Sequence, residues 1–265
     1  MIRRSSSLIQ GLRVGEPVTL VLGLGREVGD AIARTFQEDG HRVLIADPSD
    51  ERLEAARDAL EPGAATYHGE LHSRLGLRNA VTAALEAFGR IDNAVIIPEI
   101  EESDHLLDFA QERFEKALAR SARGAALALR VIAERLIEQE DLPRAGVERI
   151  PQKGTITFIL GYASIASMPG RFTETVGQSA ILGVMRAGAL ELAEHAIRVN
   201  AVVAIRPREE RAENWTARRV PLGRAAQADE IAEAARYIAS PQAAYLTGQS
   251  LILDGGRSTL SGLLD

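Results

Sequence analysis

The sequence contains no cysteine. A disulfide scaffold, a zinc site built on thiolates and a cysteine nucleophile are therefore excluded. Histidine occurs only five times, and only His68 and His72 have the i, i+4 spacing of metal ligands. We interpret that pair as solvated loop residues. The longest apolar runs, such as Ala94–Pro98 and Ile156–Leu160, are short. A bilayer-spanning helix needs roughly 20 apolar residues, so we expect no membrane segment.

Aromatic residues and basic charge are also scarce. Aromatics make up 4% of the chain, and the formal net charge is −6. Nucleic-acid binding favours a basic face and stacking rings, so we expect no nucleic-acid partner. Lysine occurs twice, at Lys116 and Lys153, and tyrosine occurs four times. This scarcity limits the catalytic pairs that the chain can form.

Hydrophobic residues make up 46% of the 265 residues, enough for a buried core. Residues 1–17 are rich in Arg and Ser and carry no acid before Glu16. We interpret them as a flexible N-terminal extension in preference to an organelle transit peptide, and we expect a cytoplasmic protein. Residues 18–265 show no internal repeat and no linker, which predicts a single domain.

Short apolar runs alternate with longer helical patterns along that domain. Strands are predicted at Val18–Leu22, Arg42–Ala46, Ala65–His68, Asn93–Ile97, Thr155–Leu160, Arg198–Ala204 and Ser250–Leu253. Helices are predicted at Val28–Glu38, Ser49–Leu60, Leu75–Phe88, Ser103–Ile137, Phe172–His195 and Ala228–Ala239. Several strands are apolar throughout, which is typical of parallel strands covered on both faces. The predicted fold class is α/β: a single doubly wound Rossmann-type domain whose seven-stranded parallel sheet has helices on both faces.

A glycine-rich turn follows the first predicted strand. Gly23, Gly25 and Gly29 allow a sharp bend and a close approach to a pyrophosphate at the N-terminus of a helix. Asp47 ends the second strand, where an acid accepts hydrogen bonds from ribose hydroxyls and repels a 2′-phosphate. The turn therefore predicts a dinucleotide pocket that prefers NAD to NADP.

Glu27 stands within this turn. If its side chain faces the pocket, it adds bulk and negative charge beside an anionic ligand. If it points outward, it is an ordinary acid in the first turn of a helix. The sequence leaves both orientations open.

Ordered motifs from the turn to the C-terminus resemble the short-chain dehydrogenase/reductase family, of the kind that includes 3-oxoacyl-carrier-protein reductases. They are Gly89-Arg-Ile-Asp92, Ala189-Leu-Glu-Leu-Ala193, Ile197-Arg-Val-Asn-Ala-Val202, Pro221-Leu-Gly-Arg224, Leu246-Thr-Gly-Gln249 and Leu253-Asp-Gly-Gly256. The resemblance covers residues 18–258 and implies a nicotinamide-dependent oxidoreductase fold. It also places Glu70 where the family has an aspartate beside the adenine.

The resemblance implies four catalytic positions. In the family a tyrosine exchanges the proton, a lysine four residues later lowers the pKa of that tyrosine, a serine binds the substrate oxygen, and an asparagine completes a water relay. Here the four positions fall on Glu174 for the tyrosine, Gln178 for the lysine, Gly161 for the serine and Ser121 for the asparagine. The chain therefore departs from the family at every one of them.

A shifted alignment does not restore the catalytic pair. The tyrosines are Tyr67, Tyr162, Tyr237 and Tyr245, and none has a lysine four or seven residues later. The segment Arg206–Val220 is also short for the substrate lid that the family carries there.

Three readings follow. We favour a non-catalytic family member that acts as a subunit or scaffold in a homo- or hetero-oligomer, a dimer or tetramer of such subunits. The second is an enzyme with another acid/base set, made of Glu174, Gln178 and Tyr162. The third is a dinucleotide sensor, compatible with either. In the sensor, binding of NAD(H) is expected to be weak, if it occurs, and dominated by the adenosine half; the second reading includes an NAD(H)-dependent oxidoreductase.

Overall fold

The computed structural model describes residues 16–25, 27–60, 62–98, 104–140, 152–205 and 219–261. Almost all of the expected extension at residues 1–17 lies outside the described residues. So does most of the short segment at 206–220.

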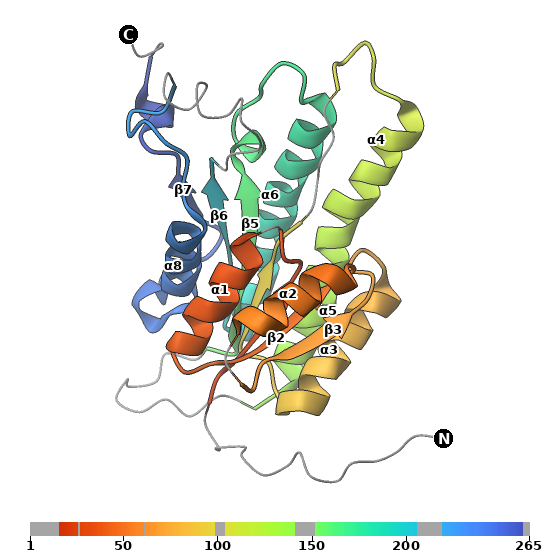
Figure 1. The fold of residues 1–265 in the computed structure, drawn as a ribbon, viewed down its shortest axis with the longest axis vertical. Coiled ribbons are helices and arrows are strands. Elements are labelled where there is room, and N and C mark those ends of the chain that lie inside the picture. Colours follow the sequence, from red (N-terminus) through yellow and green to blue (C-terminus); the bar gives the residue numbers. More distant parts are fainter. Residues whose placement is uncertain are drawn as a thin grey trace.

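Seven parallel strands form one sheet in the order β3-β2-β1-β4-β5-β6-β7, drawn as arrows in Figure 1. They are β1 (Val18–Leu22), β2 (Arg42–Asp47), β3 (Ala65–His68), β4 (Asn93–Ile96), β5 (Gly154–Gly161), β6 (Ile197–Ala204) and β7 (Ser250–Leu253). Every predicted strand is present, with each end within one residue of its predicted place. The predicted fold class is confirmed.

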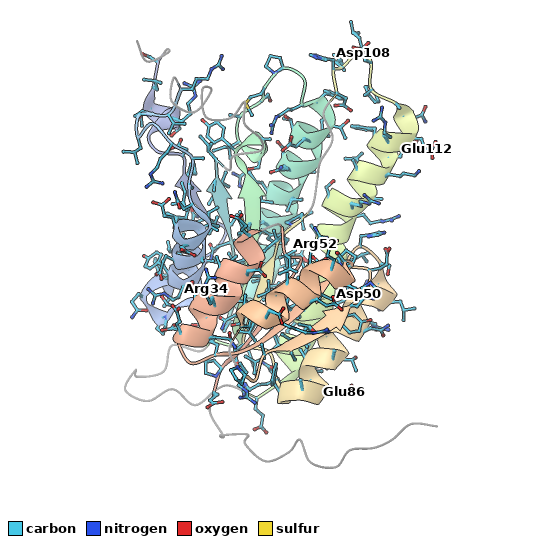
Figure 2. All side chains as sticks on the ribbon, in the orientation of Figure 1. Arg34, Asp50, Arg52, Glu86, Asp108 and Glu112 are labelled. Carbon is cyan, nitrogen blue, oxygen red and sulfur yellow. The ribbon has the colours of Figure 1, made fainter. Side chains whose placement is uncertain are left out.

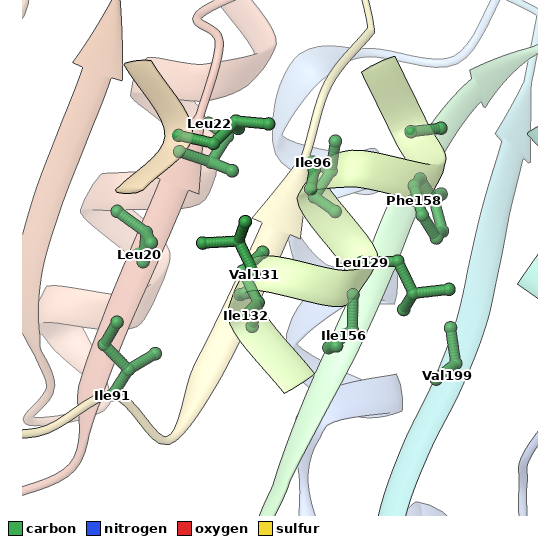
Figure 3. Close-up of a cluster of buried hydrophobic side chains, with 14 of the residues drawn as sticks. Leu20, Leu22, Ile91, Ile96, Leu129, Val131, Ile132, Ile156, Phe158 and Val199 are labelled. Carbon is green, nitrogen blue, oxygen red and sulfur yellow. The ribbon is translucent and has the colours of Figure 1, made fainter. Parts of the chain in front are cut away.

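The helices are α1 (Glu27–Glu38), α2 (Asp50–Ala59), α3 (Arg74–Phe88), α4 (Gln111–Leu118), α5 (Gly124–Glu138), α6 (Phe172–Leu192) and α8 (Ala228–Ala239). Alternate residues of each strand point to opposite faces of the sheet, so the sheet carries two cores. Leu20 and Leu22 pack with α3, α5 and α6, as the close-up in Figure 3 shows for part of this core. Val21 packs on the other face with α1, α2 and α8. None of the helices in the described ranges is long and apolar enough to cross a bilayer.

The helix predicted at Ser103–Ile137 is wrong at its start. Ser103 lies outside the described residues, residues 104–110 form a turn, and α4 begins only at Gln111. The carboxylate of Asp104 instead accepts hydrogen bonds from the backbone N–H and the hydroxyl of Thr173 at the start of α6. This tertiary contact outweighs the local helical preference of the segment.

The continuation of α4 is also irregular. Residues Ala119–Arg123 form a π-helical segment, η1, before α5 begins. π-Helical segments are rare in proteins, and those that occur are often found at functional sites. In Figure 1, α4 and α6 lie side by side at the end of the sheet to which the arrows point, and α6 also contacts the π-helical segment.

The strand order reverses between β1 and β4. From β1 the chain adds β2 and β3 on one side, and then β4 to β7 on the other. In open α/β sheets, ligands bind outside the carboxyl ends of the strands at this reversal. The loops after β1, β2, β4 and β5 therefore position the candidate site.

A buried arginine connects β6 to the end of α8. The guanidinium of Arg198 donates to the carbonyl oxygens of Ile238, Ala239, Ser240 and Leu246 over 2.7–3.3 Å. Carbonyl groups at the C-terminus of a helix lack helical partners and carry the negative end of the helix dipole, so a cation is favourable there.

We predict that Arg198→Ala lowers the free energy of unfolding by about 2–4 kcal/mol, because several buried carbonyl groups lose their donor. Urea unfolding monitored by circular dichroism measures the change. Arg236→Ala is the control, because it removes an exposed ion pair with Glu233 and should cost less than about 1 kcal/mol. Equal losses in the two variants would contradict this role of Arg198.

Candidate functional site

The glycine turn between β1 and α1 is held by close backbone contacts. Gly23 has a φ of 90°, and a Cβ at this position would lie 2.6 Å from the carbonyl oxygen of Ile97. A Cβ on Gly29 would lie 2.6 Å from the Cα of Leu24, and the Gly29 N–H donates to the Leu24 carbonyl. Gly25 also has a positive φ of 52°. The turn therefore requires glycine at 23 and 29 for steric reasons of its own.

Asp47 lies directly beside this turn. One oxygen of its carboxylate accepts the Leu24 N–H at 2.9 Å, and the other accepts the Ser49 N–H at 2.8 Å and the Nε of Arg52 at 3.0 Å. Its exposed fraction is 0%. Asp47 thus fixes the turn to the end of β2. A ribose hydroxyl would have to share this carboxylate with Arg52.

Three acidic side chains, those of Glu27, Asp30 and Asp47, lie at or beside the glycine turn. Glu27 is exposed as the first residue of α1. Burial raises the pKa of Asp30, opposed by Arg34 and reinforced by the carboxylates of Asp47 and Glu27. Figure 2 labels Arg34 on α1 and Arg52 on α2, the two cations that partly offset these charges. The turn combines the backbone of an anion site with an acidic surround.

Glu70 lies on the loop after β3. Its carboxylate pairs with Nε2 of His72 at 2.8 Å and is more than half exposed. His68 instead contacts Asp50 and the carbonyl oxygen of Pro48. The two histidines therefore have separate partners, and within the described ranges no group of His, Cys, Asp and Glu could hold a metal ion.

The structure brings three of the four predicted catalytic positions into one hydrogen-bonded chain. Gly161 ends β5, and Glu174 and Gln178 lie one turn apart on α6 with exposed fractions of only 4% and 5%. The Gly161 N–H donates to Oε1 of Gln178 at 2.6 Å, and Nε2 of Gln178 donates to Oε1 of Glu174 at 3.0 Å. Arg171 completes the chain by donating to Oε2 of Glu174 at 3.1 Å. Neighbouring side chains therefore satisfy the polar groups at these positions.

Ser121 stays outside that chain. It is fully buried in the π-helical segment, and its hydroxyl donates to the carbonyl oxygen of Ala117 at 2.7 Å. The hydroxyl is thus used within its own helix.

Tyr162 follows Gly161 at the carboxyl end of β5. Burial and the carboxylate of Asp254 raise the pKa of its phenol, against the opposing charge of Arg257. Asp254 is itself held by the backbone N–H groups of Gly256 and Ser258 after β7. A phenol with a raised pKa is a weaker proton donor near neutral pH, because general acids work best with a pKa near the operating pH.

Sequence reasoning did not single out Arg171 or Asp104. Arg171 stands three residues before Glu174, and this spacing is a recognisable signal for an ion pair on a helix. Asp104 is 69 residues from Thr173, and no local pattern predicts their contact. Phe172, the residue before Thr173, packs with the rings of Phe109 and Phe114, and the ring centroids are 5.2–5.9 Å apart.

Comparison with known proteins agrees with this architecture. Residues 23–258 match the family model described as enoyl-(acyl carrier protein) reductase. The chain belongs to the short-chain dehydrogenase/reductase family. Its likeness to 3-oxoacyl-carrier-protein reductases, expected from the sequence motifs, is confirmed by the relatives.

Two curated relatives cover almost the whole chain. Short-chain dehydrogenase reductase 3a of Arabidopsis thaliana is 28% identical, covering 95% of this chain and 99% of that protein. The 3-oxoacyl-(acyl-carrier-protein) reductase FabG of Thermotoga maritima is 25% identical, covering 92% of this chain and 99% of its own.

Solved structures show the same fold. The 3-ketoacyl-(acyl-carrier-protein) reductase of Brucella melitensis, complexed with NADH, matches with a TM-score of 0.80 and 25% identity, covering 93% of this chain and 100% of that one. Levodione reductase matches with a TM-score of 0.82 and 24% identity, covering 93% and 99%.

Proposed function

We propose that this short-chain dehydrogenase/reductase homologue does not catalyse ordinary hydride transfer and acts as a non-catalytic subunit or scaffold of an oligomer in the cytoplasm. One observation carries the proposal: Glu174, Gln178 and the Gly161 N–H are bonded to one another where the resemblance implies a tyrosine, a lysine and a serine.

The chemical reason concerns the proton. Hydride transfer to a carbonyl creates an oxyanion that must be stabilised and protonated. No tyrosine in the chain has a lysine four or seven residues later. Both carboxylate oxygens of Glu174 accept hydrogen bonds, one from Gln178 and one from Arg171, so internal donors occupy the position where the resemblance implies the tyrosine. A carboxylate beside the reacting oxygen would repel the developing negative charge.

We predict that the purified chain oxidises NADH or NADPH with ketones, and reduces NAD⁺ or NADP⁺ with alcohols, at least about 10³-fold more slowly than an active family member. The expected loss corresponds to a missing general acid and its oxyanion contact. Absorbance at 340 nm over a panel of β-ketoacyl thioesters, cyclic ketones and secondary alcohols measures it. The active Thermotoga maritima relative is the positive control. Turnover within tenfold of that control would overturn the proposal.

The scaffold role is supported by the intact fold and by the oligomers that members of this family commonly form. The described part of α6 keeps an exposed side with Ser179, Gly183, Ala187 and Leu190, of which Leu190 is 81% exposed. The exposed Arg186 and Glu191 stand among these residues, so Leu190 is the large apolar side chain that this side of α6 offers to a partner subunit.

We predict that the tagged chain, co-expressed with active reductases of the same family from its own genome, purifies as a mixed oligomer with one of them, whose mass by light scattering requires both subunits. The Thermotoga maritima relative, co-expressed in the same way, is the control for unspecific exchange. A stable homo-oligomer of the chain that retains none of the co-expressed reductases would contradict the mixed assembly.

The residues of the candidate site fit the adenosine half of a nicotinamide dinucleotide better than its nicotinamide half. The close turn at Gly23 and the carboxylate of Asp47 suit an adenosine ribose and its phosphate, although Asp47 already holds Arg52. The nicotinamide half lacks the lysine that the resemblance implies, with Gln178 in its place. We therefore propose weak, adenosine-dominated binding of NAD(H), with Asp47 favouring NAD(H) over the phosphorylated form.

We predict that Glu27→Gln tightens NADH binding about fivefold, because removing one charge near the pyrophosphate is worth roughly 1 kcal/mol at a solvated site. Titration calorimetry with NADH and ADP-ribose measures the change, and both ligands should respond equally. Glu38→Gln, an exposed acid at the far end of α1, is the matched control and should leave the affinity unchanged. Equal effects of the two variants would contradict an acidic turn that weakens dinucleotide binding.

A further inference from the structure

We propose that the carboxamide of Gln178 blocks the substrate-oxygen position of this site, and that glycine at 161 is required by Gln178 and not by the backbone. The contact between these two residues is called the blocking contact here.

The backbone at Gly161 does not require glycine. Its φ of −79° and ψ of 163° are extended values that any residue adopts. A side chain at this position meets another obstacle. A Cβ on residue 161 would lie 3.0 Å from Oε1 and 3.1 Å from Nε2 of Gln178, tighter than ordinary van der Waals contact. A side chain at 161 therefore fits only if the Gln178 amide shifts by a few tenths of an ångström.

Gln178 has little freedom to move away. Its amide oxygen accepts the Gly161 N–H at 2.6 Å, and its amide nitrogen donates to Glu174 at 3.0 Å. Only 5% of the residue is exposed. Turning the amide aside breaks both bonds and leaves polar groups at the end of β5 and on α6 without these partners, which is unfavourable in a buried place.

The contact between Gly161 and Gln178 affects the order in which these two residues can be substituted. By the family resemblance, a serine hydroxyl at position 161 holds the substrate oxygen. While Gln178 keeps its two hydrogen bonds, a side chain at 161 is crowded, so a change of residue 178 is expected to make serine at 161 easier to accommodate. The functional meaning of the blocking contact rests on the proposed function. The packing itself exists whether or not the chain turns over a ketone.

A double-mutant cycle tests the blocking contact through stability alone. In the native chain, Gly161→Ala should lower the folding equilibrium constant about fivefold or more, because the added Cβ overpacks the site. In the Gln178→Ala background, the same change should be neutral or stabilising, because it restricts the unfolded chain without a clash. The midpoint of urea unfolding measures both. The same effect of Gly161→Ala in both backgrounds would overturn the inference.

Gly183→Ala is the matched control. Gly183 lies on α6 with open space around a built Cβ, so alanine should stabilise the chain equally in both backgrounds.

Amide hydrogen exchange provides a second measurement that needs no change at 178, for the case that Gln178→Ala does not fold. Gly161→Ala should speed exchange of the residue 161 amide about tenfold, because its acceptor is pushed away. Unchanged exchange would also overturn the inference.

These readouts separate the two proposals. Ketone turnover by the native chain would refute the proposed function and leave the stability cycle as expected. An absent coupling between 161 and 178 would refute the blocking contact and leave the missing proton donor unaffected.

Discussion

Each inner strand of the parallel sheet must bury both of its faces, and most of the architecture follows from this requirement. Leu20 and Leu22 point into one core and Val21 into the other, so helices are needed on both sides of β1. The crossovers that supply them leave every strand with its carboxyl end at the same edge. Loops of different origin therefore meet at that edge, whether or not they perform chemistry there.

Backbone N–H groups at this edge need acceptors once they leave the strands. Side chains from elsewhere in the chain provide them: Asp47 for Leu24, Gln178 for Gly161 and Asp104 for Thr173. Each contact fixes a turn or a helix start to a neighbouring element. Internal acceptors therefore occupy these three backbone donors, which a substrate or cofactor would otherwise use.

The polar groups at this edge are paired with one another. At the positions where the resemblance implies a proton donor and its cationic neighbour, Glu174 and Gln178 bond to each other. Arg171 donates to the second oxygen of the Glu174 carboxylate. A buried polar network is favourable when its members find partners in this way.

Local patterns were sufficient for the strands, because a run of apolar residues between turn residues has few alternatives in a sheet buried on both faces. They were also sufficient for the glycine turn, whose residues are close in sequence. They failed at residues 104–110, because Asp104 is used to hold Thr173, and this contact outweighs helix propensity. They also left the side-chain direction of Glu27 open.

The sequence by itself determined the order of strands and helices, the family and the absence of a tyrosine–lysine pair, because each depends on residue types at short spacings. Only the tertiary structure decided that Gln178 lies over Gly161, that Asp47 is shared between the glycine turn and Arg52, and that Ser121 is used within its own helix. Those contacts depend on where distant segments meet in space, and no spacing along the chain encodes the geometry of that meeting.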